Sequence, residues 1–264
     1  MDIFSMKRMY NIFKKDKKSL IVAMDHGSAM NVFPDLLETK KVLEEIVANG
    51  ADAFLTTFGI VKNFWSTLKG TGIILRIDGG VSLLRAGSKQ YSQLFSIEDA
   101  LRVGADAVGC MGLPGTDDES TTLNYLSQIS ANAHKWNVPV LAEMLPGGFN
   151  KELHSPENIA LAARIGVELG ADMIKTEYPK NMDKFKETVK GVYKPIVVLG
   201  GNKSGDTEKL LSMVKDALDC GASGVAIGRN IWGHSQPGKM TAALNAIIHE
   251  DYTVKQALEL LKKA

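Results

Sequence analysis

A short phrase recurs four times along this chain and restricts what the chain can fold into. The segments are NGADAFL from Asn49, VGADAVG from Val103, LGADMIK from Leu169 and CGASGVA from Cys220. In each, a helical stretch ends at a glycine that can adopt a left-handed cap, and a small polar step leads into an apolar run. This is the join between a helix and the next strand of a parallel sheet, so the phrase predicts repeated β–α units.

Eight apolar runs qualify as strands, and most are continuously apolar rather than alternating, as expected when helices cover a parallel sheet. They are Leu20–Met24, Ala53–Thr57, Ile73–Ile77, Ala107–Met111, Val140–Met144, Met173–Thr176, Ile196–Leu199 and Val225–Ile227. The spacing of apolar residues predicts helices over Leu36–Ala48, Ile97–Val103, Thr121–Lys135, Ile159–Leu169, Asp183–Val189, Thr207–Leu218 and Met240–His249. A short amphipathic helix is expected near the N-terminus, and residues 78–93 are expected to form an extended loop.

Eight strands with interleaved helices in 264 residues predict a single (β/α)₈ TIM barrel over residues 1–264. A doubly wound open sheet is the alternative. It usually has a glycine-rich turn after its first strand, whereas this first strand ends in Asp25-His26-Gly27. The sequence therefore favours the barrel.

The composition excludes several classes of function. The net charge of +1 gives no global attraction for nucleic acid or an anionic membrane, and no apolar run is long enough to span a bilayer. Cys110 and Cys220 fit core packing in a reducing cytoplasm. The histidines show no metal-ligand spacing, so we expect no metal and no other cofactor.

Polar residues interrupt the apolar runs where the strands end, which is where the catalytic face of such a barrel lies. The most informative is Lys175, which follows Met173 and Ile174 within a buried strand. A buried ammonium is costly unless it is paired or deprotonated, and a free amine there could attack a carbonyl. The alternative is a structural lysine neutralised by Asp25 or Glu143.

The first strand supplies a second pair of candidates. Asp25 is expected to be an acid/base group or a partner of the Schiff base. His26 points to the other side of the strand, where a structural role is favoured.

The last two strands carry a second signal. VVLGGNKSGD places Gly200, Gly201 and Lys203 after the seventh strand, and VAIGRN places Gly228 and Arg229 after the eighth. Loops at these positions, with backbone N–H groups at the start of a helix, form the usual phosphate site of such barrels. The alternative is that these glycines only make tight turns.

These residues together resemble a known family, the archaeal-type class I aldolases. This group contains class I fructose-bisphosphate aldolase, 2-amino-3,7-dideoxy-threo-hept-6-ulosonate synthase and autoinducer-2 phosphate thiolase. The resemblance runs from about Ser19 to the C-terminus and is carried by MDHG, GADMIKTEY, PIVVLGGNKSGD and GASGVAIGRNIWGH. It implies that Lys175 is the Schiff-base lysine, that Asp25 is its acid/base partner, and that the glycine loops with Arg229 hold a substrate phosphate.

The chain departs from the family at one loop. Many members have a tyrosine proton donor before the proline of the fifth-strand loop and an arginine after it, where this chain has Leu145 and Gly147. We hypothesise that Glu143 replaces the tyrosine, because it shares a strand face with Leu145 and burial would raise its pKa. Tyr178 and Asp25 are the other candidates, and pure neutralisation of Lys175 is the alternative role for Glu143.

The leading hypothesis is a class I aldolase that acts on a ketose phosphate such as fructose 1,6-bisphosphate. A transaldolase-type synthase, an acyl-transferring thiolase and a non-catalytic sugar-phosphate-binding barrel stay open. We also expect a homo-oligomer, because the N-terminal residues offer an apolar stripe to a neighbouring subunit. The stripe comprises Phe4, Met6, Met9, Tyr10 and Phe13. Packing of this stripe on the chain's own barrel is the alternative.

Overall fold

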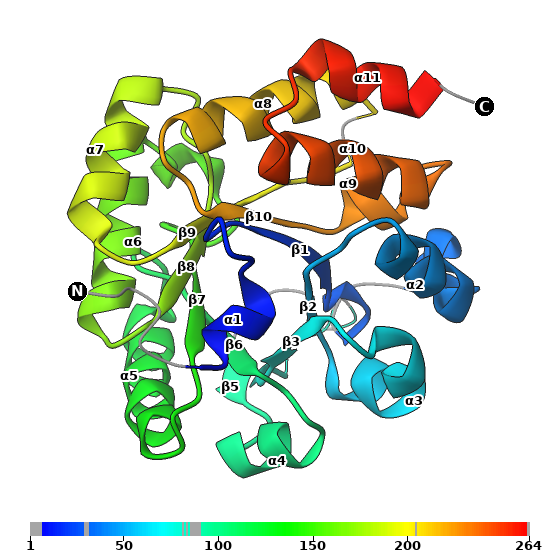
Figure 1. Ribbon diagram of the computed structural model, residues 1–264. Helices are drawn as coiled ribbons and strands as arrows, with labels where there is room; N and C mark the ends of the chain where they lie inside the picture. The colour runs from blue at the N-terminus through cyan, green and yellow to red at the C-terminus, as the bar shows by residue number, and fades with distance from the viewer. Residues whose placement is uncertain are drawn as a thin grey trace.

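The eight predicted strands close into one parallel barrel, with helices around the outside (Figure 1). The computed structural model describes residues 7–28, 32–80, 82, 84, 91–203 and 205–262. Around the barrel the strands follow the order β1-β10-β9-β8-β7-β6-β3-β2. Their bounds are β1 (Ser19–Met24), β2 (Ala53–Thr56), β3 (Gly72–Arg76), β6 (Ala107–Gly112), β7 (Val140–Met144), β8 (Met173–Thr176), β9 (Ile196–Leu199) and β10 (Gly224–Ile227). The predicted (β/α)₈ barrel is confirmed.

The helices occupy the gaps between strands that the apolar spacing predicted, with additions. They are α1 (Met9–Ile12), α2 (Thr39–Ala48), α3 (Phe58–Leu68), α4 (Ile97–Arg102), α5 (Glu119–Lys135), α6 (Pro156–Glu168), α7 (Met182–Val192), α8 (Thr207–Asp219), α9 (Arg229–Trp232), α10 (Pro237–His249) and α11 (Val254–Lys262). The sequence did not predict α3, α9 or α11. No helix among the described residues has the length and apolar character needed to cross a bilayer.

The recurring joins work as predicted, and they also fasten neighbouring strands together. The glycines of the four joins all have left-handed φ angles, between +80° at Gly104 and +98° at Gly221. In three joins the aspartate two residues after the glycine accepts a hydrogen bond from a backbone N–H near the start of the adjacent strand. The pairs are Asp52 with Leu20 N (2.6 Å), Asp106 with Ile73 N (2.9 Å) and Asp172 with Val140 N (3.1 Å). These aspartates thus satisfy backbone N–H groups near the strand starts that would otherwise lack a hydrogen-bond acceptor.

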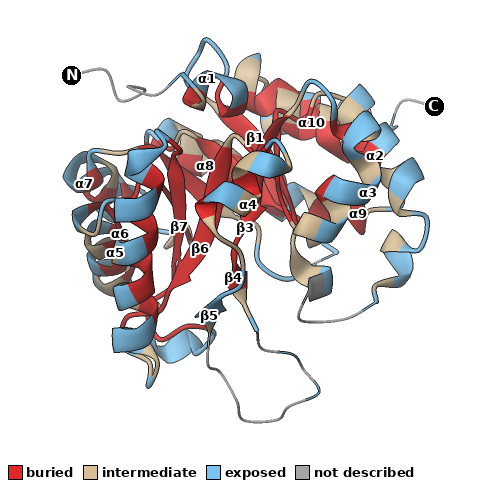
Figure 2. Ribbon diagram, turned by 90° about the horizontal axis from the view of Figure 1, so that it is seen from below, coloured by how far each residue is buried: buried red, intermediate tan, exposed pale blue. Residues whose placement is uncertain are grey.

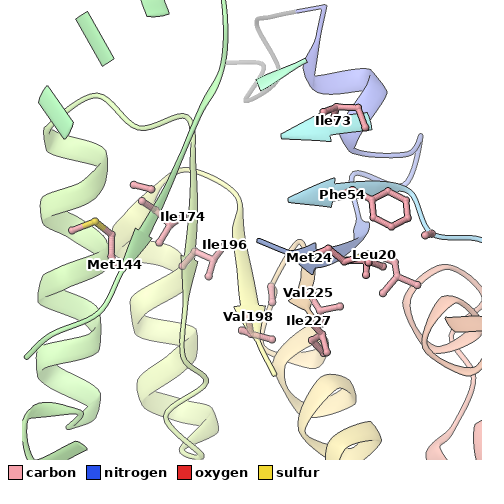
Figure 3. Packing of buried hydrophobic residues seen from close by; sticks show 14 of the residues in the cluster. Leu20, Met24, Phe54, Ile73, Met144, Ile174, Ile196, Val198, Val225 and Ile227 are labelled. Atoms are coloured by element: carbon pink, nitrogen blue, oxygen red, sulfur yellow. The ribbon is translucent and has the colours of Figure 1, made fainter. Parts of the chain in front are cut away.

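Two layers of apolar side chains hold the barrel together. The outer layer lies between strands and helices, where Leu20, Phe54 and Ile174 belong to one large buried cluster (Figure 3). The inner layer fills the barrel and includes Ile21 and Leu55. Figure 2 shows the resulting pattern, with buried strands at the centre and exposed helix faces outside.

The N-terminal helix α1 closes one end of the barrel. Met9, Ile12 and Phe13 are almost fully buried and join the inner layer, while Tyr10 stays 56% exposed. The side chain of Ser19 also donates to the carbonyl of Ile12 at 2.7 Å. The alternative of packing against the chain's own barrel is therefore confirmed for Met9 and Phe13.

The other two residues of the expected stripe, Phe4 and Met6, lie outside the described residues. Since Met9 and Phe13 are buried within the chain, the part of the stripe that is described offers only Tyr10 to a neighbouring subunit.

Residues 78–93, expected to be a loop, contain a short hairpin. Strand β4 (Asp78–Gly79) pairs antiparallel with β5 (Ser92–Gln93), and β3 ends just before β4. The backbone N–H groups of Leu94 and Phe95 both donate to the carbonyl of Ile77, at 2.7 and 3.1 Å. Both stems of this hairpin therefore lie at the C-terminal end of the barrel (Figure 2).

Candidate active site

A cavity of about 410 Å³ opens at the C-terminal ends of the barrel strands. Its wall includes residues from β1, β3, β7, β8 and β10 and from the loops that follow them. Most of the predicted site residues line this cavity, namely Asp25, Glu143, Lys175, Gly200, Gly201, Gly228 and Arg229. The sequence predicted from the barrel topology alone that these strand ends meet, and the structure brings them together around one cavity.

Lys175 belongs to this wall. It is the third residue of β8 and is only 5% exposed. In the parallel ladder it stands opposite Glu143 of β7, and its Nζ lies 2.8 Å from Glu143 Oε1. The buried ammonium is thus paired with a carboxylate, in a residue that lines the cavity.

Arg76, the last residue of β3, connects the carboxylates of the site. Its guanidinium makes two 2.8 Å contacts with Asp25 Oδ2, through Nε and Nη2. The same guanidinium contacts Glu143 Oε2 and lies 3.4 Å from Asp78 Oδ1. Three carboxylates from three strand ends therefore share one cation that is 8% exposed.

Asp78 is the structural member of this group. Its side chain is fully buried, accepts from the backbone N–H of Met111 at 2.7 Å and from the hydroxyl of Tyr125 at 3.0 Å. Burial raises the pKa of Asp78 despite the charge of Arg76. These bonds fix the end of β3 against β6 and α5, and so hold Arg76 in place.

The carboxylates that face the cavity are both ionised. Burial opposes ionisation of Asp25, but the charges of Arg76 and Lys175 outweigh burial and lower its pKa to about 2. Burial likewise opposes ionisation of Glu143, and the charges of Lys175 and Arg76 lower its pKa too. The expectation that burial would raise the pKa of Glu143 is wrong, because two cations from other strands contact it.

The expectation that Glu143 shares a strand face with Leu145 is confirmed, since both residues line the cavity. An ionised Glu143 can accept a proton, but it does not hold one to donate. This ionisation state suits proton acceptance and does not support the expectation that Glu143 replaces the tyrosine as a proton donor.

The loops after β9 and β10 form the opposite side of the cavity. The side-chain amide of Asn230 donates to the carbonyls of Gly200 and Asn202, at 2.9 and 3.3 Å, and so ties the two loops together. A Cβ on Gly228 would lie 2.2 Å from the carbonyl oxygen of Ala23, so only glycine fits there. Arg229 lines the cavity, and its buried Nε has no hydrogen-bond partner among the described residues. A guanidinium with an unsatisfied donor suits a bound anion.

Two predicted site residues lie elsewhere. Lys203 is exposed and does not line the cavity, and its Nζ lies 3.7 Å from Asp35 Oδ2. Tyr178 packs edge-on against Phe185 of α7, at a ring distance of 5.2 Å, and is likewise absent from the cavity wall. The sequence placed both near strand ends, but their side chains turn outward towards the helices.

His26 lies among aromatic side chains and also lines the cavity. Its ring packs edge-on against Trp232 and Phe33, at 5.6 and 6.2 Å, and part of it reaches the cavity wall. Burial lowers its pKa, so the ring is neutral near pH 7. The packing supports the structural role that the sequence favoured.

The cavity wall also contains residues that the sequence did not single out as site residues. Glu177 bridges Lys151 and His154, with His154 Nδ1 2.7 Å from its Oε2. His154 also lies 3.0 Å from the carbonyl of Gly148 through Nε2. Tyr91, directly before β5, lines the wall next to Leu145. Glu177 was recognisable as a strand-end residue, whereas Lys151 and Tyr91 of the wall, and His154 behind Glu177, come from short segments with no periodic signal.

A barrel with a buried lysine among ionised carboxylates, beside two glycine loops and an arginine with an unsatisfied donor, is typical of imine-forming enzymes that act on carbonyl compounds. The comparisons with known proteins narrow this class. Residues 19–234 match the model of a DeoC/LacD family aldolase. The chain belongs to this family.

Relatives match over nearly the whole chain. The chain is 35% identical to the 2-amino-3,7-dideoxy-D-threo-hept-6-ulosonate synthase of Halobacterium salinarum, over 94% of this chain and 93% of the relative. It is 30% identical to the class 1 fructose-bisphosphate aldolase of Thermoproteus tenax, over 92% and 94% of the two chains.

Solved structures agree with these relatives. A crystal structure of an archaeal fructose 1,6-bisphosphate aldolase superposes with a TM-score of 0.84 at 30% identity, covering 92% of this chain and 98% of the other. A second archaeal aldolase structure, with its catalytic lysine covalently bound to the carbinolamine intermediate of the substrate, gives a TM-score of 0.83, also at 30% identity, over 92% of this chain and 98% of that one. The chain is a Schiff-base-forming class I aldolase, as the sequence resemblance implied.

Replacing Arg76 tests its role as the shared cation of the site. Arg76→Met removes the cation that three buried carboxylates share and leaves Lys175 as the cation beside Glu143, so we expect a loss of about 3–5 kcal/mol in the free energy of unfolding. Without the cation, burial should raise the pKa values of these carboxylates above those of the unfolded chain. Stability is then lost as pH rises, and the deficit relative to wild type is larger at about pH 8 than at about pH 5.

Denaturant unfolding at both pH values checks this prediction. Arg102→Met is the matched control, because Arg102 is 77% exposed and pairs only with Asp99, so its removal should cost less than about 1 kcal/mol. A pH-independent loss equal to that of the control would contradict the role of Arg76.

Proposed function

We propose that Lys175 is the nucleophile of this aldolase and that its substrate is a phosphorylated ketose. The observation that carries the proposal is the 2.8 Å pair between Lys175 Nζ and the ionised Glu143, inside a cavity that Arg229 also lines. A lysine with an adjacent base in an enclosed site is placed to form an imine with a carbonyl carbon. A barrel that only binds sugar phosphates would not need this pair.

The steps follow from the positions of the charged groups. Glu143 takes a proton from the Lys175 ammonium, and the free amine attacks the ketone to form a carbinolamine. Loss of water gives a protonated imine, which withdraws electrons from the adjacent carbon–carbon bond. Asp25, on the other side of Arg76, takes the proton of the substrate hydroxyl, so that the bond breaks into an aldehyde and an enamine on Lys175.

Substrate orientation follows from the two ends of the cavity. The phosphate lies against Gly200, Gly201 and Gly228, with Arg229 as its cation. Arg229 makes no ion pair within 4 Å with any described carboxylate, whereas Lys151 and Lys175 each pair with one and Arg76 pairs with three. A single unpaired cation supports one phosphate at this end.

A transaldolase-type synthase is the second candidate. One relative that is named a synthase shares 35% identity, more than the 30% shared with an aldolase relative. Met111, Leu145 and Leu199 also make part of the cavity wall apolar. Such a wall suits a substrate whose end remote from the phosphate carries no second anion.

Lys175→Ala should abolish covalent labelling by borohydride in the presence of dihydroxyacetone phosphate or a panel of ketose phosphates, because Lys151, the other described lysine of the cavity wall, is held by Glu177. Intact mass measures the reduced adduct. Lys203→Ala is the control and should label as wild type does, since its ammonium pairs with Asp35 outside the cavity. Persistent labelling of Lys175→Ala would refute the assignment.

The same panel separates the two candidates. Both reactions release an aldehyde when the carbon–carbon bond breaks. An aldolase then protonates its enamine and turns over repeatedly on the ketose phosphate alone, whereas a synthase retains the enamine and stops after a single release per site until an acceptor is added.

Arg229→Ala should raise KM for a phosphorylated substrate about 30- to 150-fold, which corresponds to roughly 2–3 kcal/mol for a charged hydrogen-bonding partner. Steady-state kinetics with a phosphorylated substrate and its unphosphorylated analogue measure the effect. The analogue should show little change between wild type and variant. An equal loss for both compounds would mean that Arg229 supports the fold of the loop rather than the phosphate.

A further inference from the structure

The cleavage described above leaves one proton unassigned. When the carbon–carbon bond breaks, the electron pair stays on Lys175 as an enamine, and its carbon must gain a proton before the product can leave. Positioned proton donors contribute about 10²–10⁴-fold to such steps. The donor must reach the cavity, hold a proton at neutral pH and be free of other obligatory bonds.

Most ionisable groups of the described cavity wall fail one of these conditions. Asp25 and Glu143 are ionised in the resting site and act as bases in the steps above, and Lys175 is consumed as the imine. Asp78 reaches the site only through Arg76, because its side chain is fully buried and bonded to Met111 and Tyr125.

The groups at the two ends of the cavity fail as well. At the phosphate end, His26 lines the cavity, but burial lowers its pKa and keeps the ring neutral, and the N–H of a neutral imidazole is a much weaker acid than a phenol. At the rim, Glu177 is bound by Lys151 and His154, and the pKa of Glu177 is lowered by these bonds although burial acts against them.

Tyr91 meets all three conditions among the described residues. It lies on the cavity wall, partly buried, and packs against the cluster of Met111, Leu113 and Leu145. The β4–β5 hairpin fixes its backbone, because Ser92 pairs with Gly79 immediately after it. Burial, together with Asp78 and Glu143, raises the pKa of the phenol against the opposing charge of Arg76, so the hydroxyl stays protonated at neutral pH.

We propose that the phenol of Tyr91 donates the proton that converts the Lys175 enamine back to an imine. The Tyr91 O–H bond breaks and a C–H bond forms at the enamine carbon, while the carbon–carbon double bond electrons make this new bond. Nitrogen becomes an iminium, which water hydrolyses. The phenolate, near the guanidinium of Arg76, regains the proton that Asp25 took from the substrate hydroxyl, so the cycle closes without another reactant. This inference rests on the proposed function of Lys175.

Hydrogen exchange isolates this step. Dihydroxyacetone phosphate in D₂O forms the enamine on the wild-type enzyme and exchanges hydrogen for deuterium at the reacting carbon. Tyr91→Phe keeps the ring and removes the hydroxyl, so we expect exchange to slow by about 10²–10⁴-fold while borohydride trapping stays within about twofold of wild type. NMR of the recovered dihydroxyacetone phosphate measures exchange, and intact mass measures trapping.

Tyr10→Phe is the matched control, since Tyr10 is 56% exposed on α1 at the closed end of the barrel and should leave both readouts unchanged. Exchange at the wild-type rate in Tyr91→Phe overturns the proposal. Loss of trapping together with exchange also overturns it, because the phenol would then act in imine formation or in packing. If wild-type protein neither traps nor exchanges the probe, the function proposed for Lys175 fails and this step fails with it.

Discussion

The guanidinium of Arg76 is the interaction on which the rest of the site depends. Two buried carboxylates that face a substrate, Asp25 and Glu143, would be protonated in an apolar barrel mouth without a cation beside them. Arg76 reaches both from the end of β3 and is itself held by Asp78. An arginine is suited to this position, because its planar group binds several carboxylates at once and does not lose its proton.

This arrangement divides the acid and base roles between different residues. The carboxylates next to Arg76 are bases because its charge keeps them ionised, and Lys175 is held by one of them. A group that donates a proton to carbon must then come from outside the charge network. Tyr91 lies at the edge of this network. It contacts the apolar cluster around Leu145, and the charge of Arg76 acts on its hydroxyl.

Much of the fold could be predicted from the sequence, because the repeated helix–strand joins are local signals. Gly50 and Gly170 adopt the left-handed conformation that the phrase indicated. Strand order then brings Lys175 and Glu143 side by side, and the period of two along a strand places Glu143 and Leu145 on the same wall. Helix α3 was missed because its sequence, FGIVKNFWSTL, contains a glycine and several β-branched or aromatic residues that do not favour a helix in isolation.

The rest of the site depends on contacts between distant segments, which no local pattern contains. The pKa of Glu143 was expected to rise because its own strand is apolar, and it falls because Arg76 and Lys175 approach from other strands. Lys203 and Tyr178 follow strand ends as residues of the cavity wall do, but their side chains contact Asp35 and Phe185. Tyr91 is positioned by two-residue strands, which are too short to give a periodic signal.

The ionisation state of Glu143 tests the central claim most directly. Carboxyl-¹³C NMR of protein labelled at glutamate side chains, with the Glu143 signal assigned by its loss in Glu143→Gln, follows that carboxyl through a pH titration. If Arg76 and Lys175 govern the site, the signal stays at the ionised position from about pH 8 down to below the ordinary glutamate pKa of 4.5. A titration midpoint near neutrality would contradict this account, because Glu143 would then be a protonated acid beside Lys175 rather than its base.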